Sequence, residues 1–521
     1  MKNLIKKRNL ILATAFCLCM AALTGKTMAQ TIVAQGECGA QGDNLTWVLT
    51  SDSLLTVGGS GAMKDYSSYA NTPWFKFHLH IATLVIGDSV TTIGSNTFTV
   101  CHYLTSVTLG NSITKIGESA FNLCIRLPSV IIPNSVTEME REAFYECWSL
   151  TSIIIPNSVI SMGRSAFGDC RSLTSVVIGN GITTIEGWTF VKCSSLNSVT
   201  FGNSVRTIGE SAFENSGLTS IIIPNSVTTI GRSAFEDCSD LTSVSISNKV
   251  TTIEAYTFKN CSSLDSLIIP NSVTTLGFGA FKDCTGLTSV TIPNSVTELD
   301  SWAFHTCSSL TSVIIPSSVK EWRGAVFAFC SSLESAIIEN SVIGSDAFYG
   351  CTALSSLILG SGVKEIGEQA FVNCTGLTSI TTLATTPPTI GYPWSYQYVF
   401  YNVPTDIPVY IPCNTYGAYS QERGWDHFTN LIEDCNNVEE HCNATLQIYP
   451  NPTSGQLTID NGQLKIENVK IFDVMGKNVF QLSTLNSQLS TQINISHLPT
   501  GIYFIRIQTE TGMITRKVVK Q

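Results

Sequence analysis

The chain of 521 residues is poor in charge, and above all in basic charge. Asp, Glu, Lys and Arg make up 13% of it, about half the usual share. The 29 basic residues face 39 acidic ones, for a net charge of −10. Five of the basic residues and none of the acidic ones lie in residues 1–29, so the remainder has 24 (29 minus 5) against 39, or −15. Without a basic patch, electrostatic binding to nucleic acid or anionic lipid is excluded.

Long hydrophobic runs are absent after the N-terminus, so no transmembrane span is predicted there. Residues 2–8 are basic, residues 10–23 are apolar, and small residues end at Ala29. The apolar run is too short for a membrane anchor. The pattern therefore predicts a cleavable secretory signal over residues 1–29 and an exported protein.

Catalytic and cofactor motifs are lacking as well. The seven histidines are scattered and form no His-Glu-x-x-His pair, and there is no nucleophile elbow, phosphate loop or dinucleotide fingerprint. His78 and His80 lie on one side of a possible strand, which is a weak metal signal beside the alternative of two loop histidines. We expect no enzyme, no cofactor and no metal site.

Phenylalanine is present at a nearly constant spacing. The steps are 23 residues except for one of 22 and one of 21. A period in the twenties predicts a repeat solenoid, because one short unit cannot bury its apolar face and must stack on its neighbours. The thirteen periodic residues are Phe98, Phe121, Phe144, Phe167, Phe190, Phe213, Phe235, Phe258, Phe281, Phe304, Phe327, Phe348 and Phe371.

One repeat, residues 287–307, illustrates the unit. Its first six residues alternate and are rich in β-branched side chains, which predicts a strand that stops at Pro293. A turn, a second short apolar segment and Ala-Phe-x-x-Cys follow. The inward set is Leu, Val, Ile, Val, Ile, Ala, Phe and Cys. A glycine after the second segment predicts a tight bend in the repeats that carry Gly94, Gly117, Gly163, Gly209, Gly231, Gly277 and Gly367.

The spacing Leu-x-x-Val-x-Ile resembles the strand of a leucine-rich repeat. The continuation Pro-Asn-Ser-Val-x-x-Ile-Gly-x-x-Ala-Phe-x-x-Cys resembles the 23-residue repeats of BspA-like bacterial surface proteins, over residues 83–380. The resemblance implies a leucine-rich-repeat solenoid in which each coil has a β-strand with turn or short helical segments. It departs from the ordinary repeat because no Asn or Cys stands in the ninth position.

Twelve of the 18 cysteines follow the periodic phenylalanines by three residues, and only the Phe213 repeat lacks one. One thiol per coil pointing inward predicts a buried column of reduced thiols, because neighbours in one column do not adopt disulfide torsions. Cys38, Cys413, Cys435 and Cys442 remain. For the last two, with His441 between them, a loop disulfide, free thiols and a metal site stay open.

The ends of the repeat region differ in composition. Residues 30–82, with the aromatic cluster Trp74, Phe75 and Phe77, resemble the N-terminal cap of the BspA-like family, and residues 381–435 resemble its closing cap. Residues 436–444 read as a polar linker. Residues 445–521 alternate short strands and turns, which predicts a small all-β sandwich.

The last segment also resembles the C-terminal sorting domain of the type IX (Por) secretion system. The matching residues are Pro450, Asn451, Pro452, Gly455, Asp473, Gly476, Leu498, Gly501, Tyr503 and Lys517. The resemblance implies a Gram-negative host of the Bacteroidetes type and contact of residues 445–521 with the secretion machinery. It also implies location on the outer-membrane surface or secretion, with probable removal of the domain during attachment.

The outward positions of each strand are expected to be the third and the fifth. The third is Ser in all thirteen repeats, and the fifth forms a column of aliphatic and hydroxyl residues. At ~4.8 Å per strand this surface is roughly 60 Å long, enough for the ~800 Å² that a standard complex buries per partner. An exposed apolar stripe predicts an interaction face, although β-branched residues also simply suit strands. The candidate residues are Ile131, Ile154, Val177, Ile222, Ile268, Ile314, Ile337 and Ile358.

Aromatic residues two positions before the periodic Phe are a second candidate contact set: Trp188, Tyr256 and Trp302. Packing against adjacent coils explains them equally well. Residues 321–324, where Trp322 and Arg323 replace the usual Ile-Gly, precede the shortest repeat and predict a local kink rather than a site.

The resemblance implies a non-enzymatic surface protein that adheres to host matrix or plasma proteins, such as fibronectin or fibrinogen, or to surface proteins of other bacteria. The alternative is a structural surface-layer component that self-associates without a specific ligand. Carbohydrate capture would need a row of aromatic residues on the sheet, and the sequence places none there.

Overall fold

The computed structural model describes most of the chain after residue 29, namely 30–391, 399–435, 447–449, 455–460, 466–473, 478–483, 490–499, 501–509 and 512–520. The predicted signal (1–29) and linker (436–444) lie outside these residues. The chain divides into two units. The first runs to Thr378 and includes Pro388–Pro404, and the second comprises Ser379–Pro387 and Thr405–Gln521. No helix within the described part is long and apolar enough to cross a membrane.

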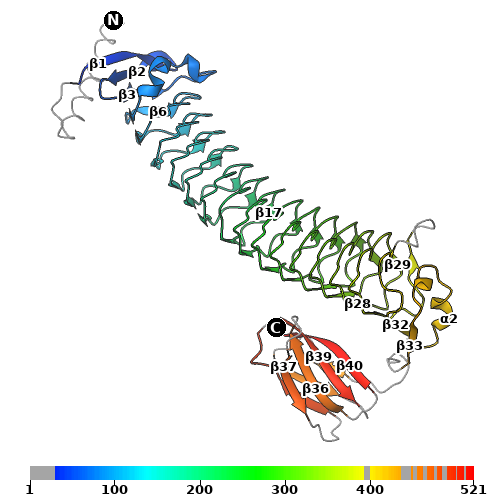
Figure 1. The fold of residues 1–521 in the computed structure, drawn as a ribbon. Helices are drawn as coiled ribbons and strands as arrows, with labels where there is room; N and C mark the ends of the chain where they lie inside the picture. The colour runs from blue at the N-terminus through cyan, green and yellow to red at the C-terminus, as the bar shows by residue number, and fades with distance from the viewer. Residues whose placement is uncertain are drawn as a thin grey trace. The chain divides into compact units, whose positions relative to one another are not determined.

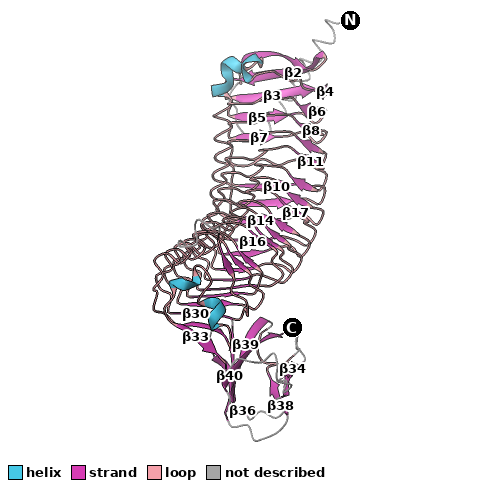
Figure 2. Ribbon diagram, turned by 90° about the vertical axis from the view of Figure 1, so that its right-hand side faces the viewer, coloured by secondary structure: helices cyan, strands magenta, loops and turns pink. Residues whose placement is uncertain are grey.

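The first unit is a solenoid of stacked coils, most of them with a longer strand, a short strand and a run of turns (Figures 1 and 2). In the coil of Ile131 the segment that corresponds to the longer strand is extended but forms no strand. The longer strands form parallel sheets on one side of the coils, and because every longer strand from β7 onward begins with Ser, we call this side the serine sheet. Its first strand, β5, begins with Thr instead. The longer strands are β5 (Thr83–Ile86), β7 (Ser106–Thr108), β10 (Ser152–Ile155), β12 (Ser175–Ile178), β14 (Ser198–Thr200), β16 (Ser220–Ile222), β18 (Ser243–Ser245), β20 (Ser266–Ile268), β22 (Ser289–Thr291), β24 (Ser312–Ile315), β26 (Ser335–Ile338) and β28 (Ser356–Leu359).

The short strands pair in parallel along a second side of the coils. Their apolar residue is buried and the residue before it is not. They are β4 (Gly61–Ala62), β6 (Val90–Ile93), β8 (Lys115–Ile116), β9 (Glu138–Met139), β11 (Ser161–Met162), β13 (Thr184–Ile185), β15 (Thr207–Ile208), β17 (Thr229–Ile230), β19 (Thr252–Ile253), β21 (Thr275–Leu276), β23 (Glu298–Leu299), β25 (Glu321–Trp322), β27 (Val342–Ile343), β29 (Glu365–Ile366) and β31 (Thr389–Ile390).

The longer strand is shorter than the six residues predicted from alternation. In β10 it begins at Ser152, and Leu150 lies in the preceding turn, where its N–H donates to Cys147 O at 3.0 Å. Because Leu150 is not part of the strand, it can be buried together with Ile153 and Ile155, which alternation alone forbids. The predicted inward set is confirmed, with the leucine supplied by a turn.

The periodic phenylalanines form one continuous stack of rings. Successive centroids are 5.1–5.8 Å apart and the ring planes lie within 21° of each other. Trp74 extends the stack before Phe98, and Phe400 extends it after Phe371. The rings are fully buried, so each coil covers the apolar face of the next.

The glycines after the short strands serve close approach between coils. Turns follow these glycines directly, but the φ angles of the glycines are not positive, so a left-handed backbone conformation is not the reason for glycine. A Cβ on Gly163 would lie 2.3 Å from the N atom of Arg141, and one on Gly117 would lie 2.7 Å from the N atom of Ser95. The backbone of the preceding coil leaves room only for hydrogen at these positions.

We expect Gly163→Ala to lower the free energy of unfolding by about 1–3 kcal/mol, because one coil must move away from its neighbour. Gly58→Ala is the matched control, since a Cβ there meets nothing within 4 Å, and it should change stability by less than about 0.5 kcal/mol. Urea denaturation of both variants measures the difference. Equal stability of the two would contradict the close approach of the coils.

The N-terminal end of the solenoid starts with the antiparallel strands β1 (Ile32–Gly39), β2 (Gly42–Thr50) and β3 (Leu54–Gly59), after which β3 pairs in parallel with β5. Two 3-10 helices follow, η1 (Tyr69–Asn71) and η2 (Phe75–His80). The segment with His78 and His80 is therefore helical, and the predicted strand is wrong. The His78 ring stacks on Phe75.

The second unit begins with a parallel sheet of β30 (Ser379–Thr382), β32 (Val409–Pro412) and β33 (Leu431–Asp434). Its helices are α2 (Tyr416–Tyr419) and η4 (Trp425–His427). The buried Tyr419 hydroxyl donates to Ala384 O at 2.7 Å, and its ring meets Trp425 edge-on. A disulfide joins Cys413 to Cys435.

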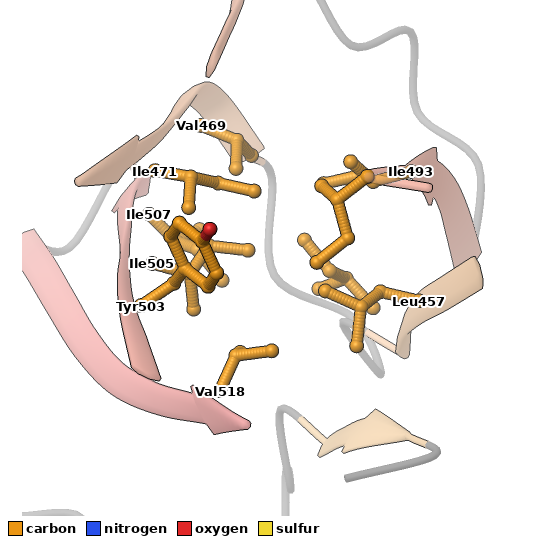
Figure 3. Packing of buried hydrophobic residues seen from close by; sticks show 10 residues of the cluster. Leu457, Val469, Ile471, Ile493, Tyr503, Ile505, Ile507 and Val518 are labelled. Carbon is orange, nitrogen blue, oxygen red and sulfur yellow. The ribbon is translucent and has the colours of Figure 1, made fainter. Parts of the chain in front are cut away.

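The C-terminal strands form two antiparallel sheets around one core (Figure 3). The first contains β34 (Gln447–Tyr449), β35 (Gln456–Asp460) and β38 (Ser490–Asn494). The second has the order β37 (Asn478–Ser483), β36 (Ile466–Asp473), β39 (Gly501–Thr509) and β40 (Gly512–Lys520). Leu457 and Ile493 of the first sheet face Ile471 and Ile505 of the second. The predicted all-β sandwich is confirmed.

Candidate interaction surface

The fifth-position column points outward from the serine sheet, as predicted. Ile131 is 85% exposed, Ile222 76% and Ile268 81%, while the residues on either side of each in the chain are buried. Ile154 and Val177 are also exposed. Such large aliphatic side chains in water are the feature that marks an interaction face. Their role in binding stays a prediction.

The column is less exposed toward the C-terminal end of the first unit. Ile314, Ile337 and Ile358 are half-buried. They lie side by side on paired strands, Ile314 opposite Ile337 and Ile337 opposite Ile358. Ile222 is paired with Ser245 and Ile268 with Thr291, which are smaller and leave the isoleucines open.

The serine sheet carries almost no charge. Its third position is always Ser, and its fifth position has no charged residue. At the second position, just before each strand, Thr hydroxyls donate to the carbonyl of the coil before, as from Thr174 to Thr151 at 2.9 Å and from Thr242 to Thr219 at 2.9 Å. The acidic residues at that position are Asp265 and Glu334. The threonine hydrogen bonds form a ladder of hydroxyls that was not predicted from the sequence. The recurrence of Thr at the second position of the repeat could have indicated it.

The candidate aromatic residues lie on the turns of the coils, away from the serine sheet. Each carries a cation from an adjacent coil over its ring: Arg164 at 4.0 Å from the centroid of Trp188, Arg232 at 5.2 Å from Tyr256 and Lys282 at 4.5 Å from Trp302. The contacts bind neighbouring coils to each other. Packing between coils therefore accounts for this set, and its role as a contact site stays a prediction.

Further aromatic residues extend this row, although they do not share one offset from the periodic Phe, which is why the spacing did not reveal them. Tyr256 contacts Phe278, Phe278 contacts Trp302, and the row continues through neighbouring rings at centroid distances of 4.9–5.8 Å. Burial, with the Lys282 charge, lowers the pKa of His305. The full row is Tyr256, Phe278, Trp302, His305, Phe329 and Tyr349.

The twelve periodic thiols are buried and free, as the sequence predicted. In eleven coils the thiol donates to the carbonyl oxygen of the Phe in the coil before, as from Cys147 to Phe121 at 3.3 Å. Ser216 takes the place of the missing cysteine and lies 3.2 Å from Cys238 Sγ. Burial raises the pKa of Cys147 from 9.0 to about 12. Neutral, enclosed thiols are poor nucleophiles and poor metal ligands.

The segment around Trp322 is a packing variation. Trp322 is buried and meets Phe327 and Phe348 edge-on. A Cβ on Gly344 would lie 2.9 Å from its ring, so the following coil needs glycine there. The ladder of short strands is interrupted between β25 and β27. The ladder is also interrupted between β11 and β13 and between β17 and β19, so the interruption is not specific to Trp322.

The repeats agree with a known family. The family described as BspA type leucine rich repeat region matches residues 71–194, 160–288 and 251–378, which together span more than half of the chain. The chain belongs to the BspA-type leucine-rich-repeat family. Residues 447–521 match the secretion system C-terminal sorting domain. This BspA-type protein is thus sent through type IX secretion of the Bacteroidetes type to the cell surface or the medium.

Solved structures similar to this BspA-type chain come from several bacteria. A leucine-rich repeat protein from Bacteroides ovatus is 25% identical, with 68% of this chain and 94% of that chain covered and a TM-score of 0.48. A leucine rich cell surface protein from Faecalibacterium prausnitzii is 26% identical (73% and 100% covered, TM-score 0.36). The pneumococcal vaccine antigen PcpA is 15% identical (78% and 98% covered, TM-score 0.35). No curated protein sequence matches the chain.

Metal ligation finds no support within the described residues, where no three His, Cys, Asp or Glu side chains gather. Of the two cysteines for which the sequence left a loop disulfide, free thiols and a metal site open, Cys435 forms a disulfide with Cys413. Cys38 is buried and free. His441 and Cys442 lie outside the described residues.

Proposed function

We propose that this BspA-type protein is a non-enzymatic adhesin that binds other proteins through the serine sheet. Its partners are host matrix or plasma proteins of the fibronectin or fibrinogen kind, or surface proteins of bacteria. The observation that supports this is the column of exposed aliphatic side chains from Ile131 to Ile268 on a sheet with almost no charge.

The energetics of such a face favour protein binding. Fully covering an exposed isoleucine removes apolar area worth about 1.5–3 kcal/mol, so a few of them supply a usable affinity. The strands beneath are held by the buried core, which leaves little ordering entropy to lose on binding. Hydroxyl groups beside the column can exchange hydrogen bonds with a partner.

The test is binding of the chain from residue 30 to 521 to immobilised fibronectin, fibrinogen and whole bacterial cells. We expect saturable binding that the double variant Ile154→Lys/Ile222→Lys weakens by about 30-fold or more, because two ammonium groups must be desolvated. Ile160→Lys is the matched control. Ile160 is 67% exposed but lies beside the short strand β11, away from the serine sheet.

Saturable binding to none of these surfaces would reject adhesion. Binding that survives the double variant but is lost in the Ile160→Lys control would move the binding face away from the serine sheet.

A further inference from the structure

The fifth-position column has a mirror order between Ile131 and Ile358, the stretch that follows Thr108. Eleven successive coils contribute one residue each, and the chemical class reads the same from either end, with Ser245 in the middle. Three aliphatic residues stand at each end, and hydroxyl and aliphatic residues alternate between them. In chain order the column is Ile131, Ile154, Val177, Thr200, Ile222, Ser245, Ile268, Thr291, Ile314, Ile337 and Ile358.

The fold of one chain does not require this order. The side chains point away from the core, and the inward residues of the same strands show no corresponding change from coil to coil. A symmetric dimer with a two-fold axis is isologous, so residue i of one copy meets residue j of the other, and j meets i. A two-fold axis along the strand of Ser245 places Val177 opposite Ile314, Thr200 opposite Thr291 and Ser245 opposite itself. In such an antiparallel pair of solenoids the mirror order brings aliphatic residues against aliphatic residues and hydroxyl residues against hydroxyl residues.

We infer that the serine sheet binds the serine sheet of a second copy of this chain, antiparallel and centred on Ser245. The inference rests on the proposed function and names its partner within the class of bacterial surface proteins. Two cells that display the chain would adhere to each other by this contact, and two copies on one cell would pair by it.

The serine sheet is nearly uncharged, which suits contact with a second uncharged serine sheet better than contact with a charged partner. The molecule carries −10, and two copies repel each other unless the charges stay away from the contact. The third and fifth positions are free of charge. The acidic residues at the second position do not meet, since Asp265 falls opposite the coil of Thr219 and Glu334 opposite the coil of Thr151.

The area also suffices. Eleven stacked coils at ~4.8 Å give a length of about 50 Å, and four residues at ~3.3 Å give a width of about 13 Å. About 650 Å² per copy lies within the range of standard interfaces, which bury about 600–1,000 Å² per partner. The aliphatic runs at the two ends, with Ile154 opposite Ile337, supply the apolar part of this contact.

The decisive experiment is a charge exchange between opposite positions, measured by analytical ultracentrifugation of residues 30–521. We expect the unmodified chain to dimerise. Val177→Lys alone and Ile314→Glu alone should each weaken the dimer by about 30-fold or more, because each places two unpaired charges in the contact. A mixture of the two variants should recover the dimer, since lysine then faces glutamate. A chain that is monomeric at every concentration, or a mixture without recovery, overturns the inference.

Cross-linking gives a second readout that does not depend on introduced charge. Ser245→Cys lies on the two-fold axis and should form a disulfide-linked dimer on mild oxidation. Thr200→Cys, on the same column but opposite Thr291, should not, and equal cross-linking of both would overturn the antiparallel register. Binding to fibronectin or fibrinogen by a chain that stays monomeric would retain the proposed function and remove only the second copy as partner.

Discussion

Phe235→Ala should lower the free energy of unfolding by about 3–5 kcal/mol. Phe235 is fully buried, and its ring stacks between Phe213 and Phe258 at 5.5 and 5.4 Å with planes 3° and 4° apart. Truncation removes contacts with both adjacent coils and leaves a void that these coils cannot close, because their own backbones already touch. Since each coil contacts only its neighbours, the loss should divide the solenoid into two parts that unfold separately.

Urea denaturation followed by fluorescence and circular dichroism measures this effect. Phe329→Ala is the matched control. Phe329 is 47% exposed on the turns, and its removal should cost less than about 1 kcal/mol. A Phe235→Ala variant as stable as the control would contradict the continuous stack.

The second large effect is a steep loss of stability at alkaline pH. Burial raises the pKa of the Cys147 and Cys193 thiols from 9.0 to about 12, and it raises that of Cys238 to about 11. Between these values the unfolded chain has lost the thiol protons and the folded chain still holds them. Stability is therefore fully present below about pH 9 and falls as the pH rises toward 12. Each of these three thiols contributes about 1.4 kcal/mol per pH unit between its ordinary and its raised pKa. Burial raises the pKa of the other periodic thiols as well, so their contributions have the same sign.

Denaturation curves between about pH 8 and about pH 11 test this expectation. The lower limit lies about one unit below the ordinary thiol pKa, and the upper limit lies within the range in which only the unfolded chain loses the thiol protons. Cys261→Ser is the control, because Ser216 already occupies the same position of another coil and serine does not titrate. The variant should keep the fold and reduce the pH slope by the share of one thiol. Stability that stays level up to pH 11, or ready labelling of native thiols near neutral pH, would contradict the buried column.

The stacking of the coils and the set of residues buried inside them could be predicted from the sequence. Phenylalanine every 23 residues predicts stacked coils, the residues between them predict the inward set, and both are confirmed because each coil repeats the same local choice of strand, turn and ring. The small all-β sandwich, the family of the repeats and the family of the sorting domain could also be predicted from the sequence.

Other features depend on distances between residues that are about 23 positions apart, and only the stack fixes these. Gly163 is required by the backbone of Arg141, and the Cys147 thiol is satisfied by a carbonyl from the coil before. Spacing along the chain contains no such distance, so it indicates a bend at the glycines and a buried column of thiols, but not the backbone atoms that these residues meet. Leu150 entered the core because a turn, and not the predicted strand, carries it.

The same division holds for the candidate surface. The sequence by itself determined which residues stand at the outward positions and in which order, because that order is a property of the chain. Tertiary structure decided how far each is exposed: Ile222 stands beside a serine and is open, whereas Ile337 stands between two isoleucines and is half covered. The physical reason is that exposure depends on which side chains of other coils lie alongside a residue, and only the stacking of the coils decides that.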